Sequence, residues 1–213
     1  MIIYNEDSAK TIAAYLLEID AIKLNTEKPF VWASGLHSPI YCDNRISLSY
    51  PEIRTFIKNE LVKACNEHFG NADIIAGVAT AGIPQGALIA DKLNLPFVYV
   101  RSAKKSHGLT NQIEGHYSKG QKAVVVEDLV STGKSSLAAV DALKEAGVEV
   151  LGMLSIFTYQ LPVAQQNFEI KNIKLISLSG YEFLIETALK NNYITETELQ
   201  SLKRWRQNPE RWK

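Results

Sequence analysis

Two acidic side chains and a group of small hydroxyl residues lie close together near residue 130. Glu127 and Asp128 follow an apolar run, and the residues after them lead toward a helix: Leu129, Val130, Ser131, Thr132, Gly133, Lys134 and Ser135. Hydroxyls, a glycine and the exposed N–H groups of a helix start are suited to a dianionic phosphate. Carboxylates accept hydrogen bonds from sugar hydroxyls. The segment therefore predicts a site for a phosphorylated ribose.

Two other interpretations of this segment are open. Ser and Thr cap many helices, so the loop can be a plain turn between a strand and a helix. The sequence Gly133-Lys134-Ser135 also matches the end of a nucleotide triphosphate loop. Asp128 occupies the position of the first glycine of that motif, and two carboxylates would repel a triphosphate. The acidic pair therefore favours ribose over a triphosphate.

The elements around this site are predicted from apolar periodicity. Helical spacing predicts helices over 8–19, 49–69, 83–93 and 135–146, and apolar runs predict strands over 74–79, 97–100, 123–126, 148–157 and 175–178. Ser49 and Glu52 have the spacing of a capping box at the second helix. Strands and helices in alternation predict an α/β fold with a parallel sheet covered by helices. Ligands then bind at the carboxyl ends of the strands.

Composition limits the class of protein. The chain has 213 residues, 46% of them hydrophobic, which is enough for one compact domain. Its 23 Lys plus Arg balance 23 Asp plus Glu, so no overall positive charge favours nucleic acid or an anionic membrane. Cys42 and Cys65 form no metal-ligand spacing. The start of the chain lacks a leader pattern and the longest apolar run, 150–157, is too short to span a bilayer. We expect a soluble, cytoplasmic protein with no nucleic-acid or membrane partner.

The acidic pair and hydroxyl loop resemble the signature of the type I phosphoribosyltransferases. That resemblance implies a central, mostly parallel sheet flanked by helices, with a small N-terminal hood and a mobile lid loop. We divide this single domain into a hood of about 1–48, a core of about 49–180 and a C-terminal helical tail of about 181–213. Glu127 and Asp128 would hold the ribose hydroxyls of 5-phospho-α-D-ribose 1-diphosphate (PRPP), and residues 129–135 its 5-phosphate. Gly77, Thr80 and Gly82 would form a second turn that binds diphosphate, although a plain turn is an equally simple interpretation.

Further segments resemble the orotate phosphoribosyltransferases within that family. They are 34–45, 98–101, 104–108 and 111–115, in family order. The polar stretch 102–120 is either a disordered connector or a lid. The resemblance implies a lid that closes over the active site of the other subunit of a homodimer. Lys105 and His107, with Arg101 at the base of the loop, would then act on PRPP, and Lys105, His107 and Asp128 would be catalytic. Mg²⁺ would be carried by PRPP without a direct protein ligand.

The implied reaction gives orotidine 5′-phosphate and diphosphate from orotate and PRPP in pyrimidine biosynthesis, with Ser131 in contact with orotate. Some family members have lysines where this chain has Ala33, Ala81 and Ser102, and an arginine near Tyr159. The loss of these cations leaves the orotate carboxylate without its usual partner. Arg45 is our candidate for this role. A salt bridge from Arg45 to Asp43 or Glu52 is the competing interpretation.

Two other functions are alternatives to this reaction. An enzyme that salvages a purine base would not be expected to resemble the stretch 38–45. A non-catalytic sensor of PRPP that regulates transcription would not need Lys105 and His107. The tail from Lys203 to Lys213 mixes cations with aromatic residues, a pattern that can bind single-stranded nucleic acid, but more often belongs to a docked surface helix.

Overall fold

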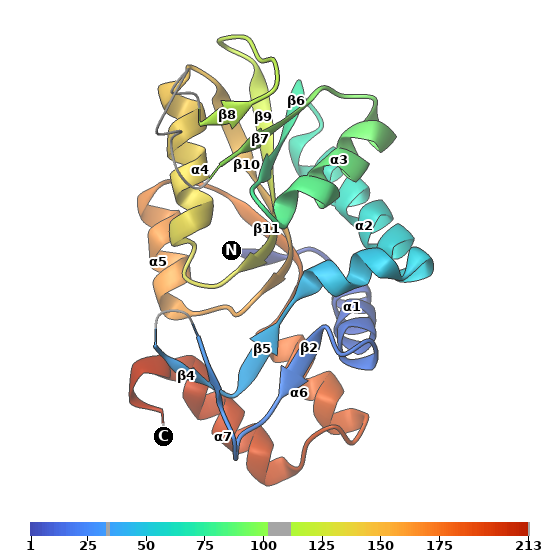
Figure 1. The fold of residues 1–213 in the computed structure, drawn as a ribbon, viewed down its shortest axis with the longest axis vertical. Coiled ribbons are helices and arrows are strands. Elements are labelled where there is room, and N and C mark those ends of the chain that lie inside the picture. Colours follow the sequence, from blue (N-terminus) through green and yellow to red (C-terminus); the bar gives the residue numbers. More distant parts are fainter. Residues whose placement is uncertain (33–34, 102–111, 213) are drawn as a thin grey trace.

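The computed structural model describes residues 1–32, 35–101 and 112–212 (Figure 1). Its centre is a seven-stranded sheet in the order β1-β11-β10-β9-β6-β7-β8. The strands are β1 Ile2–Ile3, β6 Ile74–Val78, β7 Phe97–Val100, β8 Ile113–Glu114, β9 Lys122–Val130, β10 Glu149–Thr158 and β11 Leu175–Gly180. All neighbouring strands run parallel except β7 and β8, which are antiparallel. The predicted α/β fold with a mostly parallel sheet is confirmed.

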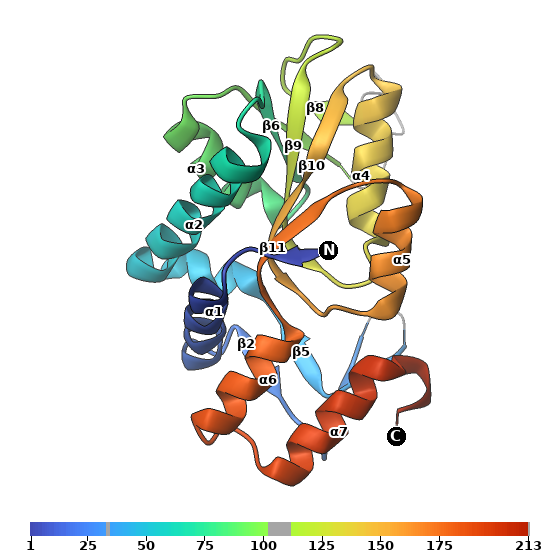
Figure 2. The ribbon, with the colours of Figure 1, turned by 180° about the vertical axis from the view of Figure 1, so that it is seen from behind.

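Helices cover both faces of this sheet (Figures 1 and 2). The helices α1 Glu6–Glu18, α2 Pro51–Phe69 and α3 Gly82–Leu93 lie on one face, and α4 Lys134–Glu145 and α5 Pro162–Ile170 on the other. The central strands are buried from both sides, which explains why β6 and residues 123–126 of β9 consist of uninterrupted apolar residues. In α4 the apolar stripe of Leu137, Val140 and Leu143 is buried, as its helical spacing predicts.

A small hood lies beyond the carboxyl ends of the central strands. It contains β2 Ile22–Leu24 paired with β5 Ile40–Cys42, and β3 Phe30–Val31 paired with β4 His37–Ser38, both antiparallel. The C-terminal helices α6 Tyr181–Lys190 and α7 Glu196–Gln207, with the 3₁₀ turn η2 Pro209–Arg211, lie at the same end of the molecule (Figure 1). The hood and the tail therefore frame the edge of the sheet at which ligands are expected.

Aromatic side chains join the hood to the tail. Trp205 of α7 is fully buried, and its ring contacts those of Trp32, Tyr159 and Tyr181. Trp32 and Tyr159 stack with centroids 5.2 Å apart. Because Trp205 faces the interior, the interpretation of the tail as a docked helix is confirmed.

Two boundary predictions near the site were wrong. Ser49 does not cap α2, because it is the last residue of a 3₁₀ helix, η1 Asn44–Ser49. The residue at the cap position is Tyr50, whose side chain makes no capping hydrogen bond. Pro51 occupies the first turn of α2, where its fixed φ suits a helix start. The strand predicted over 123–126 is also too short. β9 continues to Val130 because β10 pairs with it as far as Thr158. The acidic pair therefore lies on the strand and not in the loop.

The helix α5 was not predicted, although its residues prove to support the phosphate loop. Among the residues that the structure describes, no helix is both long enough and apolar enough to cross a membrane.

Candidate active site

The acidic pair lies where β9 extends past its neighbour β6. Strand β6 pairs with β9 only as far as Val126, whereas β10 pairs with β9 through Val130. Glu127 and Asp128 therefore occupy the carboxyl end of the sheet, with one side of the strand no longer covered by β6. This is the edge at which parallel α/β sheets bind their ligands.

Hydrogen bonds link the two acidic residues to each other and to the first turn of α4. Glu127 is 6% exposed; its Oε1 accepts from the Asp128 N–H at 3.1 Å and its Oε2 from Ser136 Oγ at 3.0 Å. Burial raises the pKa of Glu127 well above its usual range, and the charge of Asp128 adds to this shift. Burial also raises the pKa of Asp128, against hydrogen bonds from Glu127 and the Leu129 N–H that favour its charged form. Burial and the proximity of the two carboxyl groups therefore disfavour a doubly charged pair, and the hydrogen bonds favour the negative charge on Asp128 over Glu127.

The phosphate loop consists of residues 131–133, and α4 begins directly after it. Gly133 precedes the helix with a φ of 76°, and no side chain caps the helix start. The first-turn N–H groups of a helix have no intrahelical acceptor, so this end of α4 is suited to bind an anion. Lys134 and Ser135 are exposed on that turn, whereas the side chain of Val130 is buried in the core.

Two side chains of helix α5 contact the phosphate loop. Asn167 Nδ2 donates to the Thr132 carbonyl at 3.0 Å. A Cβ added at Gly133 would lie 2.6 Å from Cε2 of Phe168, so the ring of Phe168 fills the space beneath the glycine. Neighbouring residues of α5 thus fix both the position and the backbone conformation of the loop.

The predicted second turn, between β6 and α3, packs directly against β9. A Cβ added at Gly82 would collide with the Val126 carbonyl oxygen and would approach Cα of Glu127 to 3.3 Å. Only a glycine therefore lets this turn lie against the residues just before the acidic pair. Thr80, which follows a cis peptide bond after Ala79, lies in the same turn.

An aromatic cavity of about 280 Å³ opens next to the acidic pair. Its lining combines the hood with the end of β9, namely Val31, Trp32, Tyr41, Cys42, Leu129, Ser131 and Tyr159. Burial raises the pKa of the Cys42 thiol well above its usual range, and the charges of Asp128 and Asp43 add to this, so Cys42 remains a neutral thiol. An apolar cavity with a few polar groups suits a planar heterocyclic base.

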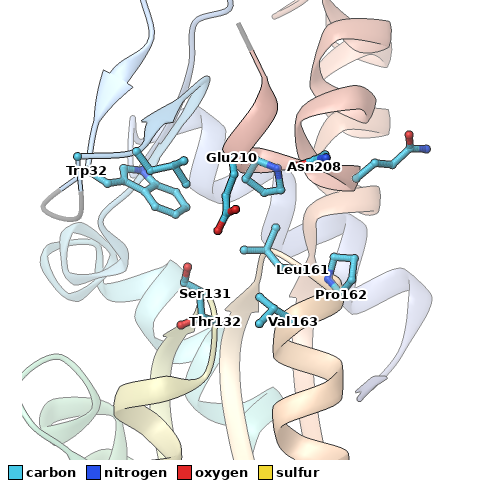
Figure 3. Close-up of a pocket in the computed structure, with 12 residues that line it drawn as sticks. Trp32, Ser131, Thr132, Leu161, Pro162, Val163, Asn208 and Glu210 are labelled. Atoms are coloured by element: carbon cyan, nitrogen blue, oxygen red, sulfur yellow. The ribbon is translucent and has the colours of Figure 1, made fainter.

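A larger cavity, of about 780 Å³, is also lined by Trp32 and Ser131 (Figure 3). The phosphate loop, the start of α5 and the C-terminal residues 207–210 enclose it, and the carboxylate of Glu210 points into it (Figure 3). This cavity has no lining residue from β9 itself, whereas the smaller one contains Leu129, next to Asp128. The smaller cavity is therefore the better position for a base that must meet the ribose.

Arg45 forms the salt bridge that was the competing interpretation. Its Nε lies 2.6 Å from Asp43 Oδ1 and its Nη2 lies 2.8 Å from Asp43 Oδ2, with 60% of the side chain exposed. The positive charge of Arg45 also favours the charged form of Asp128, so the guanidinium lies near the acidic pair. Its contact with orotate stays a prediction.

Arg101 lies at the end of β7, where the segment 102–111 begins. Its N–H donates to the Gln112 carbonyl at 2.9 Å, Gln112 Nε2 donates to the Arg101 carbonyl at 2.8 Å, and its guanidinium lies 3.4 Å from Glu114 Oε1. The two ends of the segment are thus joined at the carboxyl edge of the sheet. Lys105 and His107 lie outside the described residues.

The structure thus brings together the acidic pair, the second turn and the phosphate loop, which includes Ser131. Sequence reasoning missed Trp32, Tyr159, Ser136 and Asn167, because each acts through a contact between distant segments. Two of them had a local signal, since Ser136 directly follows the predicted residue Ser135 and Trp32 lies two positions before the segment 34–45. Within the described residues, no cluster of three or more His, Cys, Asp or Glu side chains could hold a metal ion.

Comparison with known proteins gives a consistent result. Residues 51–190 match the family model of the phosphoribosyl transferase domain. The orotate phosphoribosyltransferase of Cytophaga hutchinsonii is 55% identical over 204 residues, which cover 96% of this chain and 98% of that protein. The crystal structure of orotate phosphoribosyltransferase from Aeropyrum pernix aligns with a TM-score of 0.76 and 27% identity, over 86% of this chain and 99% of that one. UMP synthase of Leishmania donovani aligns with a TM-score of 0.79 and 26% identity over 94% of this chain, and the chain spans 42% of that protein.

Proposed function

The chain belongs to the orotate phosphoribosyltransferase family, and from this premise we propose how its own residues carry out the reaction. The enzyme transfers the ribose 5-phosphate group of PRPP to orotate and releases orotidine 5′-phosphate and diphosphate, a step of pyrimidine biosynthesis. One observation supports this assignment most strongly: the aromatic cavity and the acidic pair meet on consecutive residues of β9, Asp128 and Leu129. A base in the cavity then lies beside the ribose that Asp128 holds.

The acidic pair is proposed to hold the ribose and stabilise its positive charge. When the bond from C1 to the diphosphate breaks, positive charge develops on the sugar ring. Asp128, which carries the charge of the pair, is the less buried of the two and is placed to oppose it. Glu127 orients Asp128 through the shared hydrogen bond and completes the ribose contact.

The 5-phosphate is proposed to bind at the start of α4. The loop residues Ser131 and Thr132 and the helix residue Ser135 supply hydroxyls, and Gly133 lets the backbone N–H groups approach the phosphate oxygens. Ser131 also lines the aromatic cavity, so one residue borders both the phosphate and the base. This supports its predicted contact with orotate.

The lid is proposed to neutralise the leaving diphosphate. Arg101 and Gln112, which flank the segment 102–111, are hydrogen-bonded to each other at the carboxyl end of β7, and this supports the proposal. Lys105 and His107 would supply cations to the diphosphate and would exclude water from the reactive sugar. We propose that the lid acts on the partner site of a homodimer.

Magnesium is proposed to arrive with PRPP. Mg²⁺ usually keeps several waters and binds substrate phosphates with few protein carboxylates, and this site contains a single acidic pair. When bound, Mg²⁺ neutralises charge on the diphosphate. We also propose a cytoplasmic location, which is supported by the two free cysteines, Cys42 and Cys65.

The function is tested by a panel of bases. Purified protein is incubated with PRPP and Mg²⁺ and with orotate, uracil, adenine or hypoxanthine, and diphosphate release is measured. We expect release with orotate and the formation of orotidine 5′-phosphate. Turnover with a purine and none with orotate would reject the proposed substrate.

The shared site is tested with hybrid dimers. Lys105→Ala and Asp128→Asn each remove activity, but a mixed population places an intact lid over an intact acidic pair in one site of each hybrid. Random mixing then restores about a quarter of the wild-type activity. No recovery in verified hybrids would show that the lid acts within its own subunit.

A further inference from the structure

Asn44 is a buried polar residue between the hood and β9, and no role was predicted for it. It is the first residue of η1 and is fully buried. Its amide uses both polar atoms: Nδ2 donates to the Asp128 carbonyl at 2.8 Å, and Oδ1 accepts from Cys42 Sγ at 3.3 Å. Asn44 therefore connects a residue of the base cavity with the backbone of the acid that faces the ribose.

The hydrogen bond from Asn44 to the Asp128 carbonyl lies where β9 has no neighbouring strand on one side. Strand β6 pairs with β9 no further than Val126, so Asp128 lies beyond the last paired residue on that side of the strand. The Asn44 side chain supplies a donor to the strand there. A buried backbone carbonyl without a donor would cost free energy, so the amide holds this part of β9 in place.

The second hydrogen bond reaches the base cavity. Cys42 lines the cavity together with Tyr41, and it precedes the turn in which Asp43 caps η1. Because the Cys42 thiol remains neutral, it can donate its proton to Asn44. One side chain therefore links the cavity wall to the backbone of Asp128.

We propose that Asn44 is a positioning residue that aligns Asp128 with the base cavity, so that the ribose and the base are held in one fixed relation. This rests on the proposed function, because it names the group that sets the geometry of that same site. Asn44 itself is fully buried and does not line the aromatic cavity. Loss of a residue that orients a ligand-binding group typically costs about 10- to 100-fold in affinity or activity.

The test compares Asn44→Ala with Ser47→Ala. Ser47 is fully buried in the same 3₁₀ helix and donates to the Asn44 carbonyl at 2.6 Å, but its hydroxyl does not bond to β9. Both substitutions remove one buried hydrogen-bonding group from η1, so both lower the melting temperature. Only Asn44→Ala is expected to lower kcat/KM for PRPP, by about tenfold or more, with a fall in kcat.

A second variant keeps the test valid if Asn44→Ala does not fold. Asn44→Leu keeps nearly the same volume and leaves no cavity at this fully buried position, but it lacks the donor to the Asp128 carbonyl. We expect the same kinetic loss in this variant. Kinetic constants within twofold of wild type in a folded Asn44 variant, or an equal loss in Ser47→Ala, would overturn the proposal.

Binding of PRPP separates this proposal from the proposed function. Calorimetric titration with Mg²⁺ and PRPP, without any base, is expected to give weaker binding for Asn44→Ala than for Ser47→Ala. If the wild type binds PRPP but does not turn over orotate, the proposed substrate is wrong, while the titration still decides the role of Asn44. Equal PRPP affinity in the two variants would contradict the positioning role.

Discussion

Ser136 Oγ donates a hydrogen bond to Glu127 Oε2 at 3.0 Å, which joins the first turn of α4 to the strand on the other side of the phosphate loop. The strand before the phosphate loop and the helix after it are therefore held together by the side chains of Glu127 and Ser136. A buried carboxyl group with a raised pKa takes part in this contact. The arrangement has measurable effects on stability as well as on activity.

Glu127→Gln is expected to stabilise the protein at neutral and alkaline pH. The folded pKa of Glu127 is raised, so between its ordinary pKa and the folded pKa the native state binds more protons than the unfolded state. The free energy of unfolding of the wild type therefore falls as pH rises through this range, and the variant lacks this fall. Urea unfolding at about pH 5 and about pH 8 should show that the stability of the variant relative to the wild type increases toward the higher pH.

The control is Glu149→Gln, which changes an exposed carboxyl group. It should leave the pH dependence of unfolding unchanged. A Glu127→Gln protein that is no more stable at the higher pH would show that the Glu127 carboxyl is not held in its protonated form.

Gly133→Ala is expected to damage the phosphate loop. The residue has a φ of 76° and a Cβ would lie 2.6 Å from the Phe168 ring, so both the backbone and the packing oppose a side chain. Gly120→Ala is the matched control, because Gly120 has a φ of 81° with no atom within 4 Å of its Cβ. We expect a loss of about 1 kcal/mol for Gly120→Ala and about 2–4 kcal/mol for Gly133→Ala.

Kinetics should separate these two glycines further. KM for PRPP is expected to rise about tenfold in Gly133→Ala and to stay unchanged in Gly120→Ala. If both variants lose equal stability and neither changes KM, Phe168 does not hold the loop.

Asn167→Ala is expected to weaken PRPP binding with little effect on folding. The side chain donates to the Thr132 carbonyl from outside the core, so its removal loosens the loop without opening a cavity. KM for PRPP should rise severalfold, while KM for orotate stays within twofold. Gln166→Ala, an exposed neighbour on the same helix, should change neither constant. A rise in KM for orotate alone would contradict this role.

Arg45→Ala is expected to raise KM for orotate if Arg45 binds the carboxylate of the base. A charge-assisted contact of this kind is worth about 1.5–3 kcal/mol, which corresponds to a rise of roughly 10- to 100-fold. Arg204→Ala, which removes an exposed arginine of α7, serves as the control for net charge. An unchanged KM for orotate in Arg45→Ala would show that Arg45 does not bind the base and that its contact is the salt bridge with Asp43.

The parts of the structure that could be predicted are those set by local pattern. Apolar strands followed by amphipathic helices predicted the sheet, and the acidic pair before a hydroxyl loop predicted a site whose residues lie together at the carboxyl edge of that sheet. The length of β9 could not be predicted, because β9 extends past β6 through its pairing with β10, and the side chain of a distant residue, Asn44, binds the Asp128 carbonyl.

Contacts between distant segments explain the other failures. The stacking of Trp32 on Tyr159 joins the hood to the end of β10, and Asn167 binds Thr132 of the loop across 35 positions in the chain. Neither pair has a local spacing that a sequence pattern can reveal. The salt bridge between Arg45 and Asp43 was anticipated as an alternative, since the two residues are close in sequence.

The central claim is that the end of β9 holds the phosphoribosyl group through Asp128. Its most direct test is kcat/KM for PRPP in Asp128→Asn compared with Asp141→Asn, which makes the same change on the exposed side of α4, where Asp141 pairs with Lys171. We predict a loss on the order of 100-fold or more for Asp128→Asn and no change beyond twofold for Asp141→Asn. An Asp128→Asn enzyme that folds and keeps kcat/KM within twofold of wild type would contradict the account.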